Sequence, residues 1–128
     1  MDLFDHPDNP VPEGGICAEV TTVDGRALRT ARWMPSHRPL KGTVTLLQGR
    51  ADCIEKYFET ISDLRARGFA VVAFDWRGQG GSARLLRNPR RGHVDDFADF
   101  VVDLDTVMRE VTLAHMPGPH NILAHSTG

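Results

Sequence analysis

Cysteine and long apolar runs are both scarce in this sequence. Cys17 and Cys53 are its two cysteines, too few for a disulfide framework and without the spacing of a metal site. We therefore expect reduced thiols and a cytoplasmic protein. No stretch approaches the ~20 apolar residues of a membrane span. Residues 1–15, MDLFDHPDNPVPEGG, lack the apolar core of a secretion signal and predict an irregular arm.

A charge excess of either sign is also missing. The 15 basic and 17 acidic residues leave a net charge of −2, so neither nucleic acid nor an anionic membrane surface is expected as a partner. Hydrophobic residues make up 41% and charged residues 25% of the chain, as in ordinary globular domains. We expect one domain over residues 16–128. One local cluster is either a solvated loop or a contact for an anionic group: Arg84, Arg87, Arg90 and Arg91.

Strand signals recur along the domain, with helical patterns between the later ones. Residues 17–23 and 27–33 flank Asp24-Gly25, which predicts a leading antiparallel hairpin. Short apolar runs predict buried strands at 43–47, 69–74 and 121–125. Strands that alternate with helices indicate an α/β fold, in which a parallel sheet carries helices on both faces.

Two helices separate these later strands. In the first, Asp52 and Glu55 have the spacing of a capping box, and Gly68 supplies a left-handed stop. Its apolar face is formed by Ile54, Tyr57, Phe58, Ile61 and Leu64. The second helix is predicted over 94–111, with the apolar stripe Val94, Phe97, Val101, Leu104, Met108 and Val111. A solvated acidic face is expected for Asp95, Asp96, Asp99, Asp103 and Asp105.

The last strand runs directly into a serine-containing turn, AHSTG. Serine nucleophiles of one large fold sit on a tight strand-to-helix turn written G-x-S-x-G, with small residues two places before and after the serine. Ala124 and Gly128 meet that need around Ser126. The match is weak by itself, because a serine near a glycine at a strand end is common.

Two further motifs follow earlier strands. Gln48-Gly49-Arg50, after the strand at 43–47, can present a backbone N–H to a negative oxygen, or can be a plain strand-to-helix turn. The loop DWRGQGGS follows the strand at 69–74. Its Asp75 and Arg77 can lock the loop by a charged hydrogen bond.

The same loop contains a second pattern. Gly78, Gly80 and Ala83 fit the dinucleotide fingerprint G-x-G-x-x-A. That fingerprint needs a helix to begin at once, so that its N-terminus can hold a pyrophosphate. Here Pro89 interrupts the following stretch. A nucleotide-binding oxidoreductase is therefore the disfavoured alternative.

Taken in order, these motifs resemble the α/β-hydrolase family, in particular its lysophospholipase and monoacylglycerol-lipase-like (serine aminopeptidase-like) branch. The branch pattern is an H-G segment, then D-x-R-G-H-G-x-S, then G-H-S-x-G, and the order here is QGR, DWRGQGGS and AHSTG. The resemblance covers residues 18–128 and implies the N-terminal half of an α/β-hydrolase fold. The sequence departs from the pattern at Gln48, Gln79 and Ala124, which replace His, His and Gly.

The resemblance implies a role for each matched residue. Ser126 would be the nucleophile, and the backbone N–H groups of Thr127 and Arg50 would form the oxyanion hole. Asp75 and Arg77 would brace the loop without joining the chemistry. The implied mechanism is a Ser-His-Asp one through an acyl-enzyme, with no metal and no cofactor. The substrate would be a small-molecule or lipid ester; lysophospholipid, monoacylglycerol, a small ester and a peptide amide all remain open.

In this fold the acid and the base follow the serine along the chain. Only two residues follow Ser126 here, so we expect an N-terminal part of a longer hydrolase that is inactive alone. A non-catalytic fragment or binding module is the alternative. A packing role is expected for Cys53, and surface or structural roles are expected for His93, His115, His120 and His125.

Overall fold

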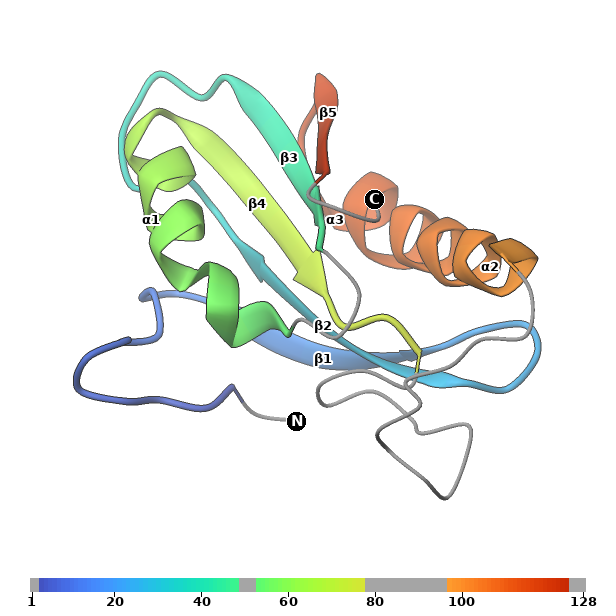
Figure 1. Cartoon of the computed structure of the whole chain (residues 1–128). Helices are drawn as coiled ribbons and strands as arrows, with labels where there is room; N and C mark the ends of the chain where they lie inside the picture. The colour runs from blue at the N-terminus through green and yellow to red at the C-terminus, as the bar shows by residue number, and fades with distance from the viewer. Residues whose placement is uncertain (1–2, 49–52, 78–96, 125–128) are drawn as a thin grey trace.

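The computed structural model describes residues 3–48, 53–77 and 97–124 (Figure 1). Five strands form one mixed sheet of order β1-β2-β4-β3-β5. The strands are β1 (Ile16–Thr21), β2 (Ala27–Trp33), β3 (Gly42–Leu47), β4 (Phe69–Phe74) and β5 (His120–Ala124). The helical elements are the 3-10 helix η1 (Ile54–Tyr57), α1 (Phe58–Ala66), α2 (Phe97–Val107), the π turn η3 (Met108–Thr112) and α3 (Leu113–His115). The predicted strands are therefore confirmed, with ends that differ by no more than two residues.

The sheet changes from antiparallel to parallel within its width. β1 and β2 form the predicted hairpin, which closes with Thr21 opposite Ala27 and with Gly25 at a φ of 86°. β2 pairs antiparallel with β4, whereas β3 pairs parallel with both β4 and β5. The carboxyl ends of β4, β3 and β5 consequently meet at one edge of the sheet.

Helices cover both faces of the sheet, as predicted for an α/β fold (Figure 1). The strand pleat sends alternate residues of β4 to opposite faces. Val71 and Ala73 join one buried cluster with residues of η1 and α1, whereas Val72 and Phe74 join a second cluster with residues of α2 and η3. The predicted apolar face of the first helix is confirmed: Ile54, Phe58 and Ile61 are buried, with Tyr57 and Leu64 packed against them.

The second helix differs from its prediction in the face that it buries. Val101, expected in the apolar stripe, is 53% exposed, whereas Val107 is fully buried. The π turn adds one residue to a helical turn, which re-phases the side chains that follow. Val111 and Thr112, both within the π turn, are buried. Residues 94–96, the predicted start of this helix, lie outside the described residues.

The prediction of a solvated acidic face is wrong for one aspartate. Asp103 is fully buried, while Asp105 on the same helix is exposed and pairs with Arg109 at 2.9 Å. The carboxylate of Asp103 is buried because it binds Arg77 from the end of β4. The helix thus carries one structural ion pair toward the sheet and one on its surface.

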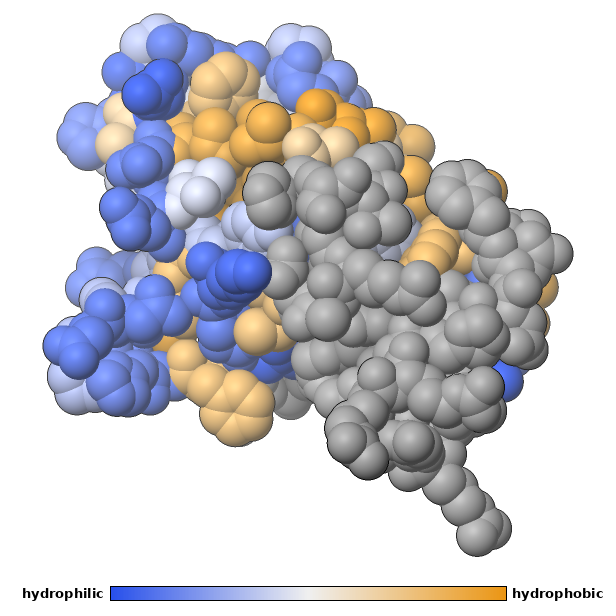
Figure 2. All heavy atoms as spheres, in the orientation of Figure 1, coloured by the Kyte–Doolittle hydropathy of each residue, from blue (hydrophilic) through white to orange (hydrophobic). Residues whose placement is uncertain are grey.

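The prediction of a buried strand at 121–125 is also wrong, because all five residues of β5 are exposed. β5 lies at the edge of the described sheet, paired with β3 alone. Its Ile122 and Leu123 are 55% and 44% exposed. Figure 2 shows apolar side chains gathered over the part of the molecule where β3, β4 and β5 lie between α1 and α2. A large apolar edge of this kind favours association with another strand or chain.

Gly68 and Gly42 are two of the described glycines with a positive φ, a backbone conformation that other residues rarely adopt. Gly68 has a φ of +97° and ends the first helical segment, as the sequence predicts. Gly42 opens β3 with a φ of +125°, and a Cβ there would lie 2.3 Å from the carbonyl oxygen of Pro119. The close approach of the segment before β5 to the start of β3 therefore requires glycine at position 42.

Candidate active site

The candidate site lies at the carboxyl ends of β4, β3 and β5. In an open α/β sheet, ligands bind beyond the carboxyl ends of the strands. The parallel register of β3 and β5 sets Leu47 opposite Ala124, and that of β3 and β4 sets Thr45 opposite Val72. The three predicted motifs therefore leave the sheet side by side. Arg50, Ser126 and Thr127 themselves lie outside the described residues, whereas Asp75 and Arg77 are described.

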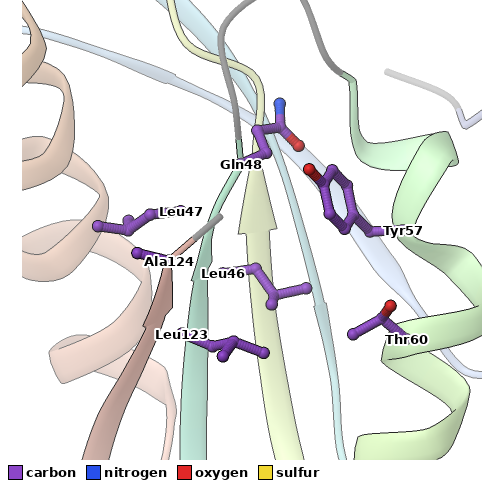
Figure 3. Close-up of a pocket in the computed structure, with 7 residues that line it drawn as sticks. All are labelled: Leu46, Leu47, Gln48, Tyr57, Thr60, Leu123 and Ala124. Atoms are coloured by element: carbon purple, nitrogen blue, oxygen red, sulfur yellow. The ribbon is translucent and has the colours of Figure 1, made fainter. Parts of the chain in front are cut away.

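A cavity of about 180 Å³ opens beside these strand ends. Figure 3 shows Leu46 of β3 and Leu123 of β5 pointing toward α1, with Tyr57 and Thr60 facing them from η1 and α1. The amide of Gln48 and the ring of Tyr57 point toward one another at the end of the cavity. The cavity thus has leucine walls and a polar end next to the strand termini.

Asp75, directly after β4, lies at the centre of a buried polar network. Its Oδ1 accepts hydrogen bonds from Gln48 Nε2 at 3.2 Å and from the Ile54 backbone N–H at 2.9 Å. Its Oδ2 accepts a hydrogen bond from Arg29 Nε at 2.7 Å. Asp75 therefore joins the ends of β3 and β4 to the start of η1. We expected a charged hydrogen bond between Asp75 and Arg77, but the partners described for each of them come from other elements.

Arg29 and Glu55 extend this network away from the strand ends. The Arg29 guanidinium donates from Nη1 to Glu55 Oε2 at 2.6 Å and from Nη2 to Glu55 Oε1 at 2.5 Å. Burial alone would lower the pKa of Arg29, but its bonds to Glu55 and Asp75 outweigh burial and raise it. Burial alone would raise the pKa of Glu55, and its bonds to Arg29 and the Phe4 N–H outweigh that effect and lower it. Both groups are held in their charged forms.

This use of Glu55 corrects the capping-box prediction. η1 starts after Cys53, which makes no side-chain capping bond. The two Glu55 oxygens bind Arg29, a partner that the sequence pattern does not predict. The other predicted member, Asp52, lies outside the described residues.

Arg77 forms a second buried network on the α2 side of the sheet. Its backbone N–H and its Nε each donate to Asp103 at 2.8 Å. Its Nη1 and Nη2 donate to Asp24, in the β1–β2 turn, at 2.7 and 3.1 Å. The hydrogen bonds from Arg77, followed by one from Thr22, lower the pKa of Asp24 to about 2. Burial raises the pKa of Asp103, an effect that the bonds from Arg77 offset only in part.

Trp76, between the two network residues, fixes the end of β3. Its indole Nε1 donates to the backbone carbonyl of Gln48 at 2.9 Å. Its ring makes edge contacts with Phe74 and Phe100, at centroid distances of 4.7 and 5.0 Å. Gln48 is therefore held through both its side chain and its backbone.

Sequence reasoning did not find Arg29, Glu55 and Asp103 as members of these networks. One signal was available: Arg29 stands in the middle of ALRTARW, a strand that is almost wholly buried. A charged residue in such a strand requires an opposite charge nearby. The position of that charge could not be read from the sequence, since Asp75 lies 46 residues away and Glu55 lies 26 residues away.

Histidine and cysteine contribute little to the described site. His6, His37, His115 and His120 are exposed, while His93 and His125 lie outside the described residues. Burial raises the pKa of the Cys53 thiol, which makes this group a weaker nucleophile at neutral pH. Among the described residues, no group of three or more His, Cys, Asp or Glu could hold a metal ion. In that same part of the chain, no helix has the length and apolar character needed to cross a membrane.

Known proteins are similar to this chain in sequence and in fold. Residues 38–128 match the family described as serine aminopeptidase, S33. Lysophospholipase L2 of Escherichia coli (strain K12) is 40% identical over 114 residues, which are 87% of this chain and 32% of that protein. Monoacylglycerol lipase of Mycolicibacterium smegmatis is 32% identical over 96 residues, which are 75% of this chain and 32% of that protein. The chain thus spans about a third of the length of these curated relatives.

Solved structures agree at the level of the fold. A thermostable carboxyl esterase from Bacillus coagulans matches with a TM-score of 0.72 at 20% identity, over 91% of this chain and 38% of the other. A soluble variant of monoglyceride lipase from Saccharomyces cerevisiae matches with a TM-score of 0.70 at 21% identity, over 91% of this chain and 36% of the other. The chain belongs to the serine aminopeptidase S33 family and has part of the α/β-hydrolase fold.

Proposed function

We propose that the protein is a serine hydrolase that cleaves carboxylic esters through an acyl-enzyme, with Ser126 as the nucleophile. The observation that carries this proposal is the parallel register that sets Leu47 opposite Ala124. Arg50 follows Leu47 by three residues and Ser126 follows Ala124 by two. Adjacent strands lie about 4.8 Å apart, a separation that suits a nucleophile and an oxyanion donor acting on one carbonyl group.

In the proposed mechanism, Ser126 Oγ attacks the ester carbonyl and a histidine takes its proton. The backbone N–H groups of Arg50 and Thr127 stabilise the oxyanion. The acyl-enzyme is then released as a carboxylic acid by water. The histidine and its acid would come from the part of the protein that corresponds to the other two thirds of the relatives. The 128-residue chain is accordingly expected to be inactive alone.

The proposed substrates are lipid esters with one acyl chain, of the lysophospholipid or monoacylglycerol class. The names of the relatives from Escherichia coli and Mycolicibacterium smegmatis support this class. We place the activity in the cytoplasm, because the two cysteines are free thiols rather than a disulfide.

The test compares Ser126→Ala with Ser62→Ala in the whole protein that contains this sequence. Ser62 is an exposed serine on α1 and serves as the matched control. Hydrolysis of a lysophospholipid, a monoacylglycerol and p-nitrophenyl butyrate is followed by acid release. We expect Ser126→Ala to lower kcat by about 10⁴-fold or more and Ser62→Ala to leave it unchanged. Equal activity of the two variants would refute the role of Ser126.

The two alternatives give different results in the same protein. A binding module would bind the esters without releasing acid. A nucleotide-binding oxidoreductase would bind NAD in calorimetry, through the Gly78, Gly80 and Ala83 pattern, which lies outside the described residues. The described topology does not favour the second alternative, because that pattern follows β4 rather than the first strand of the sheet.

A further inference from the structure

One oxygen atom of Asp75 holds both ends of a single chain segment. Asp75 Oδ1 accepts hydrogen bonds from Gln48 Nε2 and from the Ile54 backbone N–H. Gln48 directly follows β3, and Ile54 is the first residue of η1. The Asp75 side chain is 0% exposed, so solvent does not compete for these bonds. The entry to this segment and its exit are therefore fixed relative to each other.

Asp75 is in turn oriented by Arg29. The guanidinium divides its donors, with Nε binding Asp75 Oδ2 and the two Nη atoms binding the two oxygens of Glu55. The Asp75 N–H also donates to the Arg29 carbonyl at 3.0 Å. A planar guanidinium with fixed carboxylates on two of its edges cannot rotate freely. A displacement of Glu55 would therefore move Arg29 and, through it, Asp75.

The N-terminal arm, residues 1–15, binds Glu55, the residue at the other end of this series of contacts from Asp75. The Phe4 backbone N–H donates to Glu55 Oε2 at 2.9 Å, and Asn9 Nδ2 donates to the Glu55 carbonyl at 2.8 Å. The Phe4 ring lies over the Arg29 guanidinium, 5.9 Å from its Cζ to the ring centroid. Leu3 and Val11 pack against the buried cluster on the α1 side. The arm predicted to be irregular is thus attached to the fold at defined points.

We propose that the N-terminal arm is a positioning element of the hydrolase site, acting through Glu55, Arg29 and Asp75 on the two ends of the segment that contains Arg50. The inference rests on the proposed function, in which this segment supplies one oxyanion donor. Glu55, Arg29 and Asp75 are positioning residues, because they act on the reaction only through that segment. Misplacement of an oxyanion donor weakens transition-state binding more than substrate binding. Loosening the arm should consequently lower kcat and leave KM unchanged.

Paired substitutions in the whole protein test whether the arm acts through Glu55, Arg29 and Asp75. Phe4→Pro removes the N–H that binds Glu55, whereas Phe4→Leu removes the ring and keeps the N–H. Glu55→Gln removes the charge that holds Arg29, and Glu59→Gln is its control, because Glu59 is an exposed glutamate one turn further along. Two quantities are measured for each variant: kcat and KM on p-nitrophenyl butyrate, and amide hydrogen exchange of the peptide spanning residues 48–54.

We expect Phe4→Pro and Glu55→Gln to lower kcat about tenfold, with KM within about twofold of the parent. Amide exchange in the 48–54 peptide should be faster in both variants. Glu59→Gln should match the parent, and Phe4→Leu, which loses the ring contact with Arg29 but keeps the N–H, should lower kcat less than Phe4→Pro does. Unchanged kcat in Phe4→Pro and Glu55→Gln, or a raised KM with unchanged kcat, would overturn the inference. If the parent protein hydrolyses no ester, the proposed function fails and the arm has no catalytic role. The exchange data would then show separately whether the arm is coupled to this segment.

Discussion

Asp103→Asn should cause a large loss of stability, because it removes the negative charge of a buried ion pair. Asp103 is 0% exposed and accepts two bonds of 2.8 Å from Arg77, whose side chain is also buried. Asparagine keeps one acceptor and places an amide N–H₂ near the second donor. Arg77 then has only partly exposed carboxylates as described partners, Asp24 at 2.7 Å and Asp99 at 3.8 Å. Removing one partner of a buried ion pair costs about 3–5 kcal/mol. Because burial raises the pKa of Asp103, we expect the lower end of that range, about 3 kcal/mol.

Urea unfolding followed by tryptophan fluorescence measures this loss. With a slope of about 1.5 kcal/mol per molar urea, the midpoint should fall by about 2 M. The matched control is Asp105→Asn on the same helix, whose side chain is 59% exposed and pairs with an equally exposed Arg109. That change should cost less than about 0.5 kcal/mol. Equal midpoints for the two variants would refute the assignment of Asp103 as a buried structural anion. A further check is Arg77→Met with Asp103→Leu, which should cost less than Asp103→Asn because no buried charge is left unpaired.

Three further predictions concern pH, the end of β3 and the start of β3. The bonds from Arg77, followed by that from Thr22, lower the pKa of Asp24 from 3.8 to about 2. The contribution of ionised Asp24 to the free energy of unfolding should therefore be complete above about pH 4 and be lost as the pH falls toward 2. Urea unfolding of Asp24→Asn should show a loss of about 1 kcal/mol at pH 7, a value that allows for the 42% exposure of this side chain. The stability of this variant should also depend less on pH below pH 4. Gln48→Leu removes a donor to Asp75 and should lower kcat for p-nitrophenyl butyrate about tenfold, whereas Gln48→His keeps an N–H donor and should lie within about threefold of the parent. Gly42→Ala should lower the free energy of unfolding by about 3 kcal/mol in thermal unfolding, because φ at this position is +125° and the added Cβ meets the Pro119 carbonyl. The control is Gly25→Ala, where φ is +86° and nothing lies within 4 Å of the added Cβ; it should cost about 1 kcal/mol.

Local patterns predict the strands and the first helix well. The β-branched and apolar runs of β2 and β4 end where the sequence predicts, at Trp33 and Phe74. Asp24-Gly25 predicts the hairpin because only a few residues tolerate the required turn conformation. The order of the motifs, combined with a family resemblance, predicts which strand ends meet at one edge. Local chemistry is sufficient for the strands and the hairpin, whereas the meeting of the strand ends also required the family resemblance.

The features that sequence patterns miss are those set by distant residues. Periodicity places Val101 in the core, whereas the helix buries Asp103, which pairs with Arg77, and leaves Val101 exposed. The apolar residues 122–124 predict a buried strand, whereas the exposure of a strand is decided by whether neighbouring elements cover it. The sequence pattern assigns the Glu55 carboxylate to a local cap, whereas the structure shows that both of its oxygens bind Arg29 of β2. A charge-assisted bidentate pair is stronger than a single capping bond.

The central claim is that the ends of β3 and β5 form the site of a serine nucleophile. The most direct test is to treat the whole protein with a fluorophosphonate probe and locate the adduct by tandem mass spectrometry. Our account predicts one adduct, on the peptide containing Ser126, absent from Ser126→Ala and retained in Ser62→Ala. An adduct on another serine, or no adduct on a folded protein that hydrolyses esters, would contradict it.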